Sequence, residues 1–358
     1  MVHSVFPTSP NGPPRQPDIV AAVRQRILNG DYPAGGQLPT VRELGQEFYA
    51  SLPTIHRSLK TLGDHGFIST HGRRGTRVVD YPPHRHCFGL IMGELPDEQG
   101  IYHNRHWQAL AMAATELAND PIYRIELFHG IDGHPQLPEH QRLLAALSDQ
   151  RLAGIIVADP VRIHPWCDLT AINLPVIGFS PVPERPDLGI IDLGTSTFIQ
   201  RAIEVIAERG LRHIALILPA GSSCIGLAAA FIRGLQAHGL EAPAYWIHTA
   251  PLDAPAWAAH CVASLFHPDH VRVPEALIIA DDNVLPDVER GLREQTRSHP
   301  FLVCMANVPQ LEPLSPQVMH LGWDQREYLH CAMARLCAYH QRQEPVGWSM
   351  LPVRMLNL

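Results

Sequence analysis

Two short stretches near the start of the chain carry basic and polar residues at spacings that suit contact with a nucleic acid. In the first, apolar residues recur every third or fourth position and leave an outer face with Thr54, His56, Arg57 and Lys60. The second is a turn with His71, Gly72, Arg73 and Arg74. Basic side chains pair with phosphates, and hydroxyl, imidazole and guanidinium groups can read base edges. These residue types predict a surface for double-stranded operator DNA.

Three helices and a hairpin are expected to position these side chains within residues 17–79. The apolar spacing of residues 19–28 predicts a helix with Asp18 as its N-cap and Gly30 as its stop. Thr40 and Glu43 form a capping-box pattern at the start of a second helix. A third helix follows at 52–62, and the strands 67–70 and 76–79 close the unit. This order predicts a winged helix-turn-helix, a fold that also serves in some proteins as a protein-binding module.

The run ILNGDYPAGGQLPTVRELGQEF resembles the start of a GntR-type DNA-binding domain. The matching positions are Gly30, Tyr32, Gly35, Leu38, Pro39, Arg42 and Leu44, followed by Thr54, Ile55, Leu59, Leu62, Gly66, Gly75 and Thr76. The resemblance implies that DNA is contacted by Arg42 from the second helix, by Thr54 from the third, and by His71 and Gly72 from the wing. Leu52 and His56 depart from the family pattern, in which arginine is common at both positions.

Composition separates a basic start from an acidic remainder. Residues 1–80 hold nine Lys or Arg and six Asp or Glu, whereas the remaining residues hold 19 and 29. A basic module attracts polyanions. The seven cysteines include no C-x-x-C pair, no apolar run approaches the ~20 residues of a membrane span, and no secretory signal pattern opens the chain. The sequence therefore predicts a cytoplasmic protein without a membrane segment, with a Pro-rich disordered tail at 1–16.

After a polar linker at 80–86, apolar strands alternate with helices from residue 87 to residue 352. Such alternation predicts an α/β fold with parallel sheets covered on both faces. The alternation restarts after residue 190, which predicts two lobes with a ligand cleft between their strand ends. We expect lobe 1 to hold 87–190 and 301–322, and lobe 2 to hold 191–300 and 323–352.

The same order of elements resembles the effector domain of LacI-type regulators, which is related to periplasmic sugar-binding proteins. The motifs are GIIDLGTSTFIQRAIEVIAERGLRHIALI, PEALIIADDN and HLGWDQREYLHCAMARL. The resemblance implies a cleft lined by Asp159, Ser180, Asp281, Asp282, Asn283, Asn307 and Trp323. Carboxylates and amides there would bind the hydroxyl groups of a sugar or related metabolite, and an indole face would stack on its ring. Leu227 and Ala306 depart from the pattern of sugar-binding members.

Other chemistry has weak support in the sequence. GSSCIG at 221–226 fails the nucleophile-elbow pattern at Ile225, and the histidine pairs at 103/106 and 267/270 are expected by chance among 22 histidines. We therefore expect no metal, cofactor or catalytic site. The leading hypothesis is a ligand-controlled transcription regulator, most simply a repressor, that acts as a homodimer. The alternative is an enzyme or small-molecule binding protein with an accessory winged helix.

Overall fold

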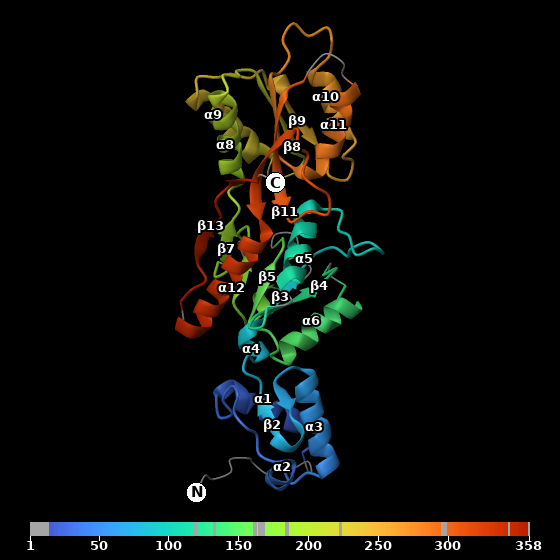
Figure 1. The fold of residues 1–358 in the computed structure, drawn as a ribbon, viewed down its shortest axis with the longest axis vertical. Helices are drawn as coiled ribbons and strands as arrows, with labels where there is room; N and C mark the ends of the chain where they lie inside the picture. The colour runs from blue at the N-terminus through green and yellow to red at the C-terminus, as the bar shows by residue number, and fades with distance from the viewer. Residues whose placement is uncertain are drawn as a thin grey trace.

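In a computed structural model, the chain forms three units that follow one another along the long axis of the molecule (Figure 1). The structure describes residues 14–117, 120–131, 134–159, 163, 169–182, 186–221, 224–294, 299–342 and 344–356. Most of the tail expected to be disordered, 1–13, lies outside these ranges. The winged helix lies at one end, lobe 1 in the middle and lobe 2 at the other end.

The winged helix begins with α1 (Gln16–Asn29), α2 (Val41–Glu47) and α3 (Leu52–Asp64). The capping box of α2 is confirmed, since Thr40 N–H donates to Glu43 Oε2 at 2.7 Å and Glu43 N–H to Thr40 Oγ1 at 3.2 Å. The expected N-cap of α1 is wrong by three positions. Helix α1 starts earlier, and the Asp18 carboxylate accepts a 2.8 Å hydrogen bond from the backbone N–H of Arg15, as the N3 residue of its own capping box.

The wing is an antiparallel hairpin of β1 (Ile68–Thr70) and β2 (Thr76–Val78). A 3₁₀ turn, η1 (Gly72–Arg74), joins the strands, with positive φ at Gly72 and Gly75. Both ends of the hairpin are anchored, because Ile68 and Val78 are paired and buried in the core of the winged helix. The turn is therefore the part of the hairpin that projects from the domain.

The segment expected to be a polar linker, 80–86, is a structured joint. It contains the one-turn helix α4 (Pro83–His86), which packs against α12 (Gln325–Arg342) of lobe 1. His84 stacks on Phe67 of the winged helix with ring centroids 5.9 Å apart, and His86 stacks on Tyr123 of lobe 1 at 5.6 Å. A neutral imidazole ring can stack on an aromatic ring as an apolar group does. The polar composition of residues 80–86 gives no sign of this packing.

Lobe 1 is built on a parallel sheet in the order β13-β7-β6-β5-β3-β4. Its strands are β3 (Cys87–Ile91), β4 (Arg124–Phe128), β5 (Gly154–Val157), β6 (Val176–Gly178), β7 (Gly189–Asp192) and β13 (Trp348–Met350). Helices α5 (Arg105–Leu117) and α12 cover one face, and α6 (Pro138–Ser148) with η2 (Leu169–Ala171) covers the other.

Lobe 2 has a second six-stranded sheet in the order β14-β12-β11-β10-β8-β9, parallel except for β14. The strands are β8 (Ile214–Pro219), β9 (Ile247–Ala250), β10 (Ala276–Ile279), β11 (Phe301–Val308), β12 (Val318–Asp324) and β14 (Arg354–Met355). Helices α8 (Thr195–Glu208) and α9 (Cys224–Ala237) cover one face, and α10 (Trp257–Leu265) and α11 (Leu285–Glu294) cover the other (Figure 1). The short turns η3 (Ala244–Trp246) and η4 (Asp282–Val284) precede β9 and α11.

The expected exchange of C-terminal segments between the lobes is wrong in its direction. Strands β11 and β12 belong to the sheet of lobe 2, whereas α12 and β13 return to lobe 1 and β14 completes lobe 2. The chain therefore crosses between the lobes after β7, after β12 and after β13. Strand β11 belongs to the sheet of lobe 2 because its backbone hydrogen-bonds in parallel to β10.

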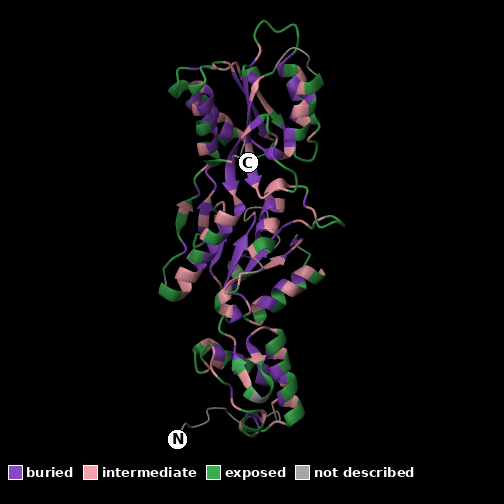
Figure 2. Ribbon diagram, in the orientation of Figure 1, coloured by how far each residue is buried: buried purple, intermediate pink, exposed green. Residues whose placement is uncertain are grey.

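Apolar side chains fill the interior of all three units, as the buried positions along the sheets show (Figure 2). One cluster runs from lobe 1 into lobe 2 through residues such as Phe88, Phe198 and Trp323. The winged helix has a separate core. The α/β fold with a winged helix and two lobes is thus confirmed. None of the helices in the described part of the chain is long and apolar enough to cross a membrane.

Candidate DNA-binding surface and effector cleft

The third helix of the winged helix presents the polar face that its sequence predicts. Ile55, Leu59 and Leu62 are buried, whereas His56, Arg57 and Lys60 are exposed. Ser51 caps the helix, since its Oγ accepts from Thr54 N–H at 3.4 Å and lies 2.8 Å from Thr54 Oγ1. The cap fixes Thr54 at the first turn of α3. This end of the helix points away from lobe 1, which the other end of α3 approaches.

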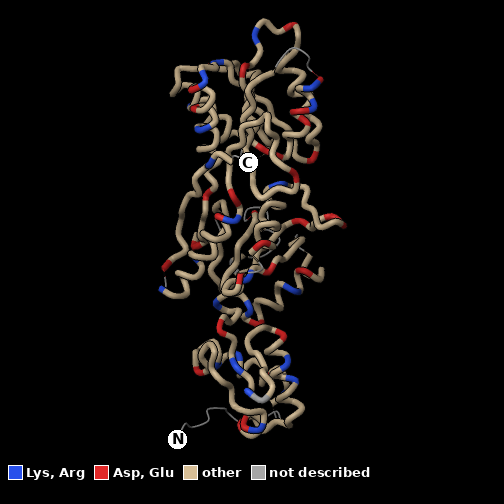
Figure 3. Tube along the Cα trace, in the orientation of Figure 1, with Lys and Arg blue, Asp and Glu red and all other residues tan. Residues whose placement is uncertain are grey.

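Arg42 and the turn of the wing supply further exposed polar residues. Arg42 is exposed on the first turn of α2, and His71, Gly72 and Arg74 are exposed in the turn of the hairpin. His71 is held by Ser69, whose Oγ lies 3.0 Å from its Nε2. The side chain of Arg73 lies outside the described part of the structure. Lys and Arg positions are distributed over the helices and the hairpin of the winged helix (Figure 3).

The first part of the candidate effector site is a turn at the carboxyl end of β10. Asp281 caps this turn, because its Oδ1 accepts from the backbone N–H of Asn283 at 2.8 Å and from Asn283 Nδ2 at 2.6 Å. Asn283 Oδ1 in turn accepts a 2.8 Å hydrogen bond from the backbone N–H of Arg105, at the start of α5 in lobe 1. This bond joins the two lobes across the edge where their strands end.

A second polar chain, led by Asp282, runs deeper between the lobes. The carboxylate of Asp282 accepts from the backbone N–H of Asn307 at 3.0 Å and from Gln310 Nε2 at 3.1 Å. Asn307 Oδ1 accepts from Gln325 Nε2 at 2.9 Å and lies 3.3 Å from His106 Nδ1. The network therefore connects lobe 2, the second crossing at Gln325 and the first turn of α5.

Burial sets the charge states in this network. It raises the pKa of Asp282 to about 7, and the charge of Asp281 adds to the effect, while the hydrogen bonds from Asn307 oppose it. Burial also lowers the pKa of His106 to about 4. Near neutral pH the imidazole is therefore uncharged, and the raised pKa of Asp282 makes its protonated form more accessible than that of an exposed carboxyl group. Such a network suits polar, uncharged groups better than a second charge.

On lobe 1, the residues predicted to face the effector follow strands β5 and β6. Phe179 directly follows β6, and its ring meets that of His106 edge to face with centroids 5.4 Å apart. Asp159 and Ser180 are partly exposed beyond the same strand ends. Because carboxyl ends of parallel strands share one edge of a sheet, these residues lie on the side of lobe 1 that carries His106.

Two groups of predicted cleft residues differ in exposure. Asp281, Asp282 and Asn307 are brought together but buried, with Asp282 only 1% exposed. Asp159, Ser180 and Asn283 are partly exposed. Trp323 is a correction: its side chain is 1% exposed in the core shared by the lobes, and its Nε1–H donates to the Leu351 carbonyl at 3.2 Å. At 1% exposure the indole offers no free face for a ligand in this structure.

Sequence reasoning missed three polar residues of the network: His106, Gln310 and Gln325. His106 had drawn attention only as part of a metal-like pair, and among the described residues no group of three or more His, Cys, Asp or Glu could hold a metal ion. Gln325 begins α12 directly after the Trp-Asp pair of the third effector-domain motif. Its place in that motif could have indicated that it belongs to the site. Ser222 and Ser223 of the rejected GSSCIG motif lie outside the described residues.

Fold and sites together define a winged helix-turn-helix module joined to a two-lobed domain of the kind found in periplasmic binding proteins and LacI-family regulators. Residues 16–78 match the family model described as bacterial regulatory proteins, gntR family, and form a GntR-type helix-turn-helix domain. This span agrees with the unit described above, from the start of α1 to the end of the wing.

Two curated regulators match parts of the chain. An uncharacterized HTH-type transcriptional regulator, YieP, from Escherichia coli is 38% identical over 61 residues, which are 17% of this chain and 26% of that protein. The vitamin B6 salvage pathway transcriptional repressor PtsJ from Salmonella typhimurium is 28% identical over 188 residues, which are 48% of this chain and 44% of that protein. The chain thus spans less than half the length of these curated relatives.

Solved structures match the two-lobed domain. A putative LacI transcriptional regulator from Bacillus cereus has a TM-score of 0.58 at 16% identity and covers 76% of this chain and 96% of its own. The trehalose repressor from Escherichia coli also has a TM-score of 0.58, at 15% identity, over 76% of this chain and 100% of its own. At such identities the likeness establishes the fold of the two-lobed domain.

Proposed function

We propose that the protein is a ligand-responsive transcription regulator that binds operator DNA through its winged helix. The observation that carries this proposal is the polar surface formed by α3, the start of α2 and the hairpin turn. A helix of this kind enters the major groove with its N-terminal residues toward the bases, while a wing follows the backbone. Arg57 and Lys60 are exposed on the helix, and Arg42 and Arg74 flank it.

The effector is a small polar molecule, a sugar or related metabolite, bound between the lobes. Asp159, Ser180 and Asn283 supply partly exposed acceptors and donors, and Phe179 supplies an aromatic face in place of Trp323. The buried residues Asp282 and Asn307 tie the lobes together behind them. The name of one structural neighbour, the trehalose repressor, supports a sugar as the first class to test.

A homodimer is the simplest form in which this regulator acts. One winged helix reads a short half-site, whereas two copies related by a two-fold axis match a near-palindromic operator and give sufficient affinity. Closure of the lobes on a ligand would change how two copies meet and hence the spacing of their winged helices. If ligand binding abolishes operator binding, the protein is a repressor that its effector releases from the DNA.

Gel mobility shift with the DNA upstream of the gene tests the proposal. We expect a shift with micromolar or tighter affinity that weakens as salt rises, together with a change of at least fivefold when the cognate sugar is added. A coupling of about 1–3 kcal/mol corresponds to roughly 5- to 150-fold, and the DNA must alter ligand affinity by the same factor. Absence of any sequence-preferring shift would refute the regulator, and a shift indifferent to every polar metabolite would refute the effector.

A further inference from the structure

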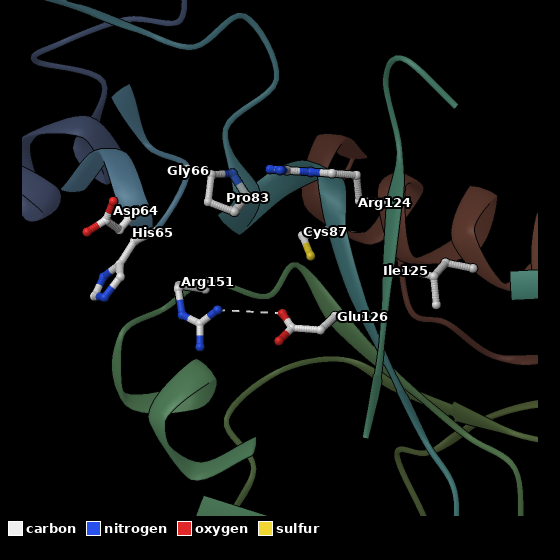
Figure 4. Close-up of a pocket in the computed structure, with 9 residues that line it drawn as sticks. All are labelled: Asp64, His65, Gly66, Pro83, Cys87, Arg124, Ile125, Glu126 and Arg151. Atoms are coloured by element: carbon white, nitrogen blue, oxygen red, sulfur yellow. Dashed lines mark ion pairs between the residues drawn. The ribbon is translucent and has the colours of Figure 1, made fainter. Parts of the chain in front are cut away.

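A cavity of about 230 Å³ lies where the winged helix meets lobe 1, away from both sites described above (Figure 4). The end of α3 contributes His65 and Gly66 to it, and the edge of lobe 1 contributes Arg124, Glu126 and Arg151. A cavity needs about 10–15 Å³ of such volume to hold one water molecule, so this space holds several. It is large enough for a phosphate or a small carboxylic acid.

The nitrogen atoms around this junction cavity have unused hydrogen-bonding capacity. Within the part of the chain that the structure describes, Arg124 makes no side-chain hydrogen bond or ion pair, and the buried Arg151 Nε and His65 Nδ1 have no partner. The remaining contacts are long: Arg151 lies 3.5 Å from Glu126, and His65 Nε2 lies 3.7 Å from Asp149. Buried donors without partners are costly, and a ligand that accepts hydrogen bonds would satisfy them.

The acidic neighbours leave the cationic side of the cavity available. Glu126 is already paired with Arg142, from α6, at 2.7 Å, which is closer than its contact with Arg151. The carboxylate of Asp64 points away from the arginines (Figure 4). The thiol of Cys87 is neutral, because burial raises its pKa to about 11. Two guanidinium groups, of Arg124 and Arg151, line this small cavity, and guanidinium groups are usual recognition elements for phosphate and carboxylate.

Gly66 lies in contact range of one of these groups. The backbone of Gly66 has φ +78°, and a Cβ atom added there would lie 3.4 Å from the Arg124 guanidinium. The Arg124 side chain therefore reaches from lobe 1 to the backbone just after the C-cap of α3. Any anion held by Arg124 would then touch both units.

We propose that the junction cavity binds a small anion, carrying a phosphate or carboxylate group, which bridges Arg124 and Arg151 of lobe 1 and the end of α3. Such a ligand fixes the angle between the winged helix and the lobes, and it would give the protein a second input beside the interlobe cleft. The binding step stands independently of the proposed DNA and sugar functions, since it can be measured without either.

Calorimetric titration of the full chain with inorganic phosphate and, separately, with citrate tests this inference at constant ionic strength set with sodium chloride. We expect saturable binding of at least one anion, and the arm that binds more tightly identifies the chemical group. Arg124→Gln should raise Kd at least tenfold, because it removes the charge from a residue that has no other partner to lose. Arg233→Gln, at an exposed arginine on α9, is the matched control and should leave Kd unchanged.

A second variant separates this cavity from the interlobe cleft. Asn283→Ala changes the cleft and should leave anion binding intact, whereas Arg151→Gln should weaken it as Arg124→Gln does. The inference is overturned if neither anion binds saturably, or if the Arg124 variant binds as tightly as the unmodified protein. It is equally overturned if Asn283→Ala abolishes binding, since the anion would then occupy the cleft.

Discussion

The guanidinium of Arg24, in the first helix of the winged helix, donates a 2.8 Å hydrogen bond to the carboxylate of Asp149, at the end of α6 in lobe 1. Arg24 is only 8% exposed, so this ion pair is largely removed from solvent. Together with α4 and its stacked histidines, it makes the junction between the two units a defined interface. Reorientation of the winged helix therefore has to break a specific contact.

The Arg24 contact should be measurable as a coupling. Asp149→Ala leaves a buried guanidinium without its partner, and we expect a loss of about 1–3 kcal/mol in the free energy of unfolding. In the double variant with Arg24→Met the loss should be smaller than the sum of the two single losses. Urea denaturation of the four proteins provides the cycle. Strictly additive losses would mean that the pair does not hold the junction.

DNA binding should depend on charge at the surface of the winged helix. We expect Arg42→Ala with Arg57→Ala to weaken operator binding, and to lower the slope of log affinity against log salt by about one unit per lost phosphate contact. Fluorescence anisotropy at several salt concentrations gives both values. The control is Arg233→Ala on lobe 2, and a result equal to that control would remove these arginines from the interface.

Asn283 should matter for the effector and not for DNA. Its Oδ1 accepts from the Arg105 backbone across the lobes, so Asn283→Ala should weaken closure on the ligand and raise the effector Kd roughly 3- to 10-fold, the worth of one hydrogen bond. Affinity for DNA without ligand should not change. Titrations with and without operator supply the numbers, and the exposed Asn173 offers a control substitution to alanine. Unaltered ligand affinity in Asn283→Ala would exclude this edge of the cleft.

Trp323 should behave as a core residue. Its side chain is buried among apolar neighbours of both lobes, so Trp323→Ala should cost about 3–5 kcal/mol, while Trp323→Phe should cost less. Thermal unfolding followed by circular dichroism would rank the variants. If the alanine variant keeps the stability of the original protein but loses its ligand, the indole lines the cleft after all.

Stability should fall in mild acid because of the joint at α4. Burial lowers the pKa of His84 to about 4, and the charge of Arg85 and the nearby His340 and His86 act in the same direction. The folded state therefore binds fewer protons than the unfolded chain between pH 4 and about 6.5, and stability is lost as pH falls through that window. His84→Phe keeps the stacking on Phe67 and removes the titrating group.

The measurement for His84 is the melting temperature from pH 7.5 to pH 4.5. We expect the original protein to lose several degrees more than the His84→Phe variant across this range. His238→Phe, at an exposed position, controls for the added aromatic ring. If the melting temperatures of all three proteins fall in parallel with pH, the titration of His84 does not affect stability.

The winged helix was predictable because its signals are local in sequence. Capping residues, a helical apolar repeat and a glycine turn determine α2, α3 and the wing within about 40 positions. The strands of both lobes were also evident as apolar runs. Which sheet each late strand joins was not, because β11 and β12 are placed by pairing with partners tens of residues away.

The candidate cleft was predicted less well for a related reason. A polar residue after a strand, such as Asp282, lies at the edge where open α/β sheets generally bind ligands, but its exposure depends on Asn307 and Gln310 from a distant segment. Trp323 shows the same limit, since nothing in its neighbours along the chain says that the indole turns inward. His84 and Arg24 were missed because their partners lie in a different unit.

The three crossings between the lobes also determine the order in which the protein can form during synthesis. Residues 16–78 contain every element of the winged helix, so that module can fold once it has left the ribosome. Neither sheet is complete until β13 and β14 at residues 348–355 have emerged. A nascent chain therefore presents the proposed DNA-binding surface well before it has the lobes that would respond to a ligand. If synthesis is interrupted, the released fragment would contain the folded winged helix without complete lobes.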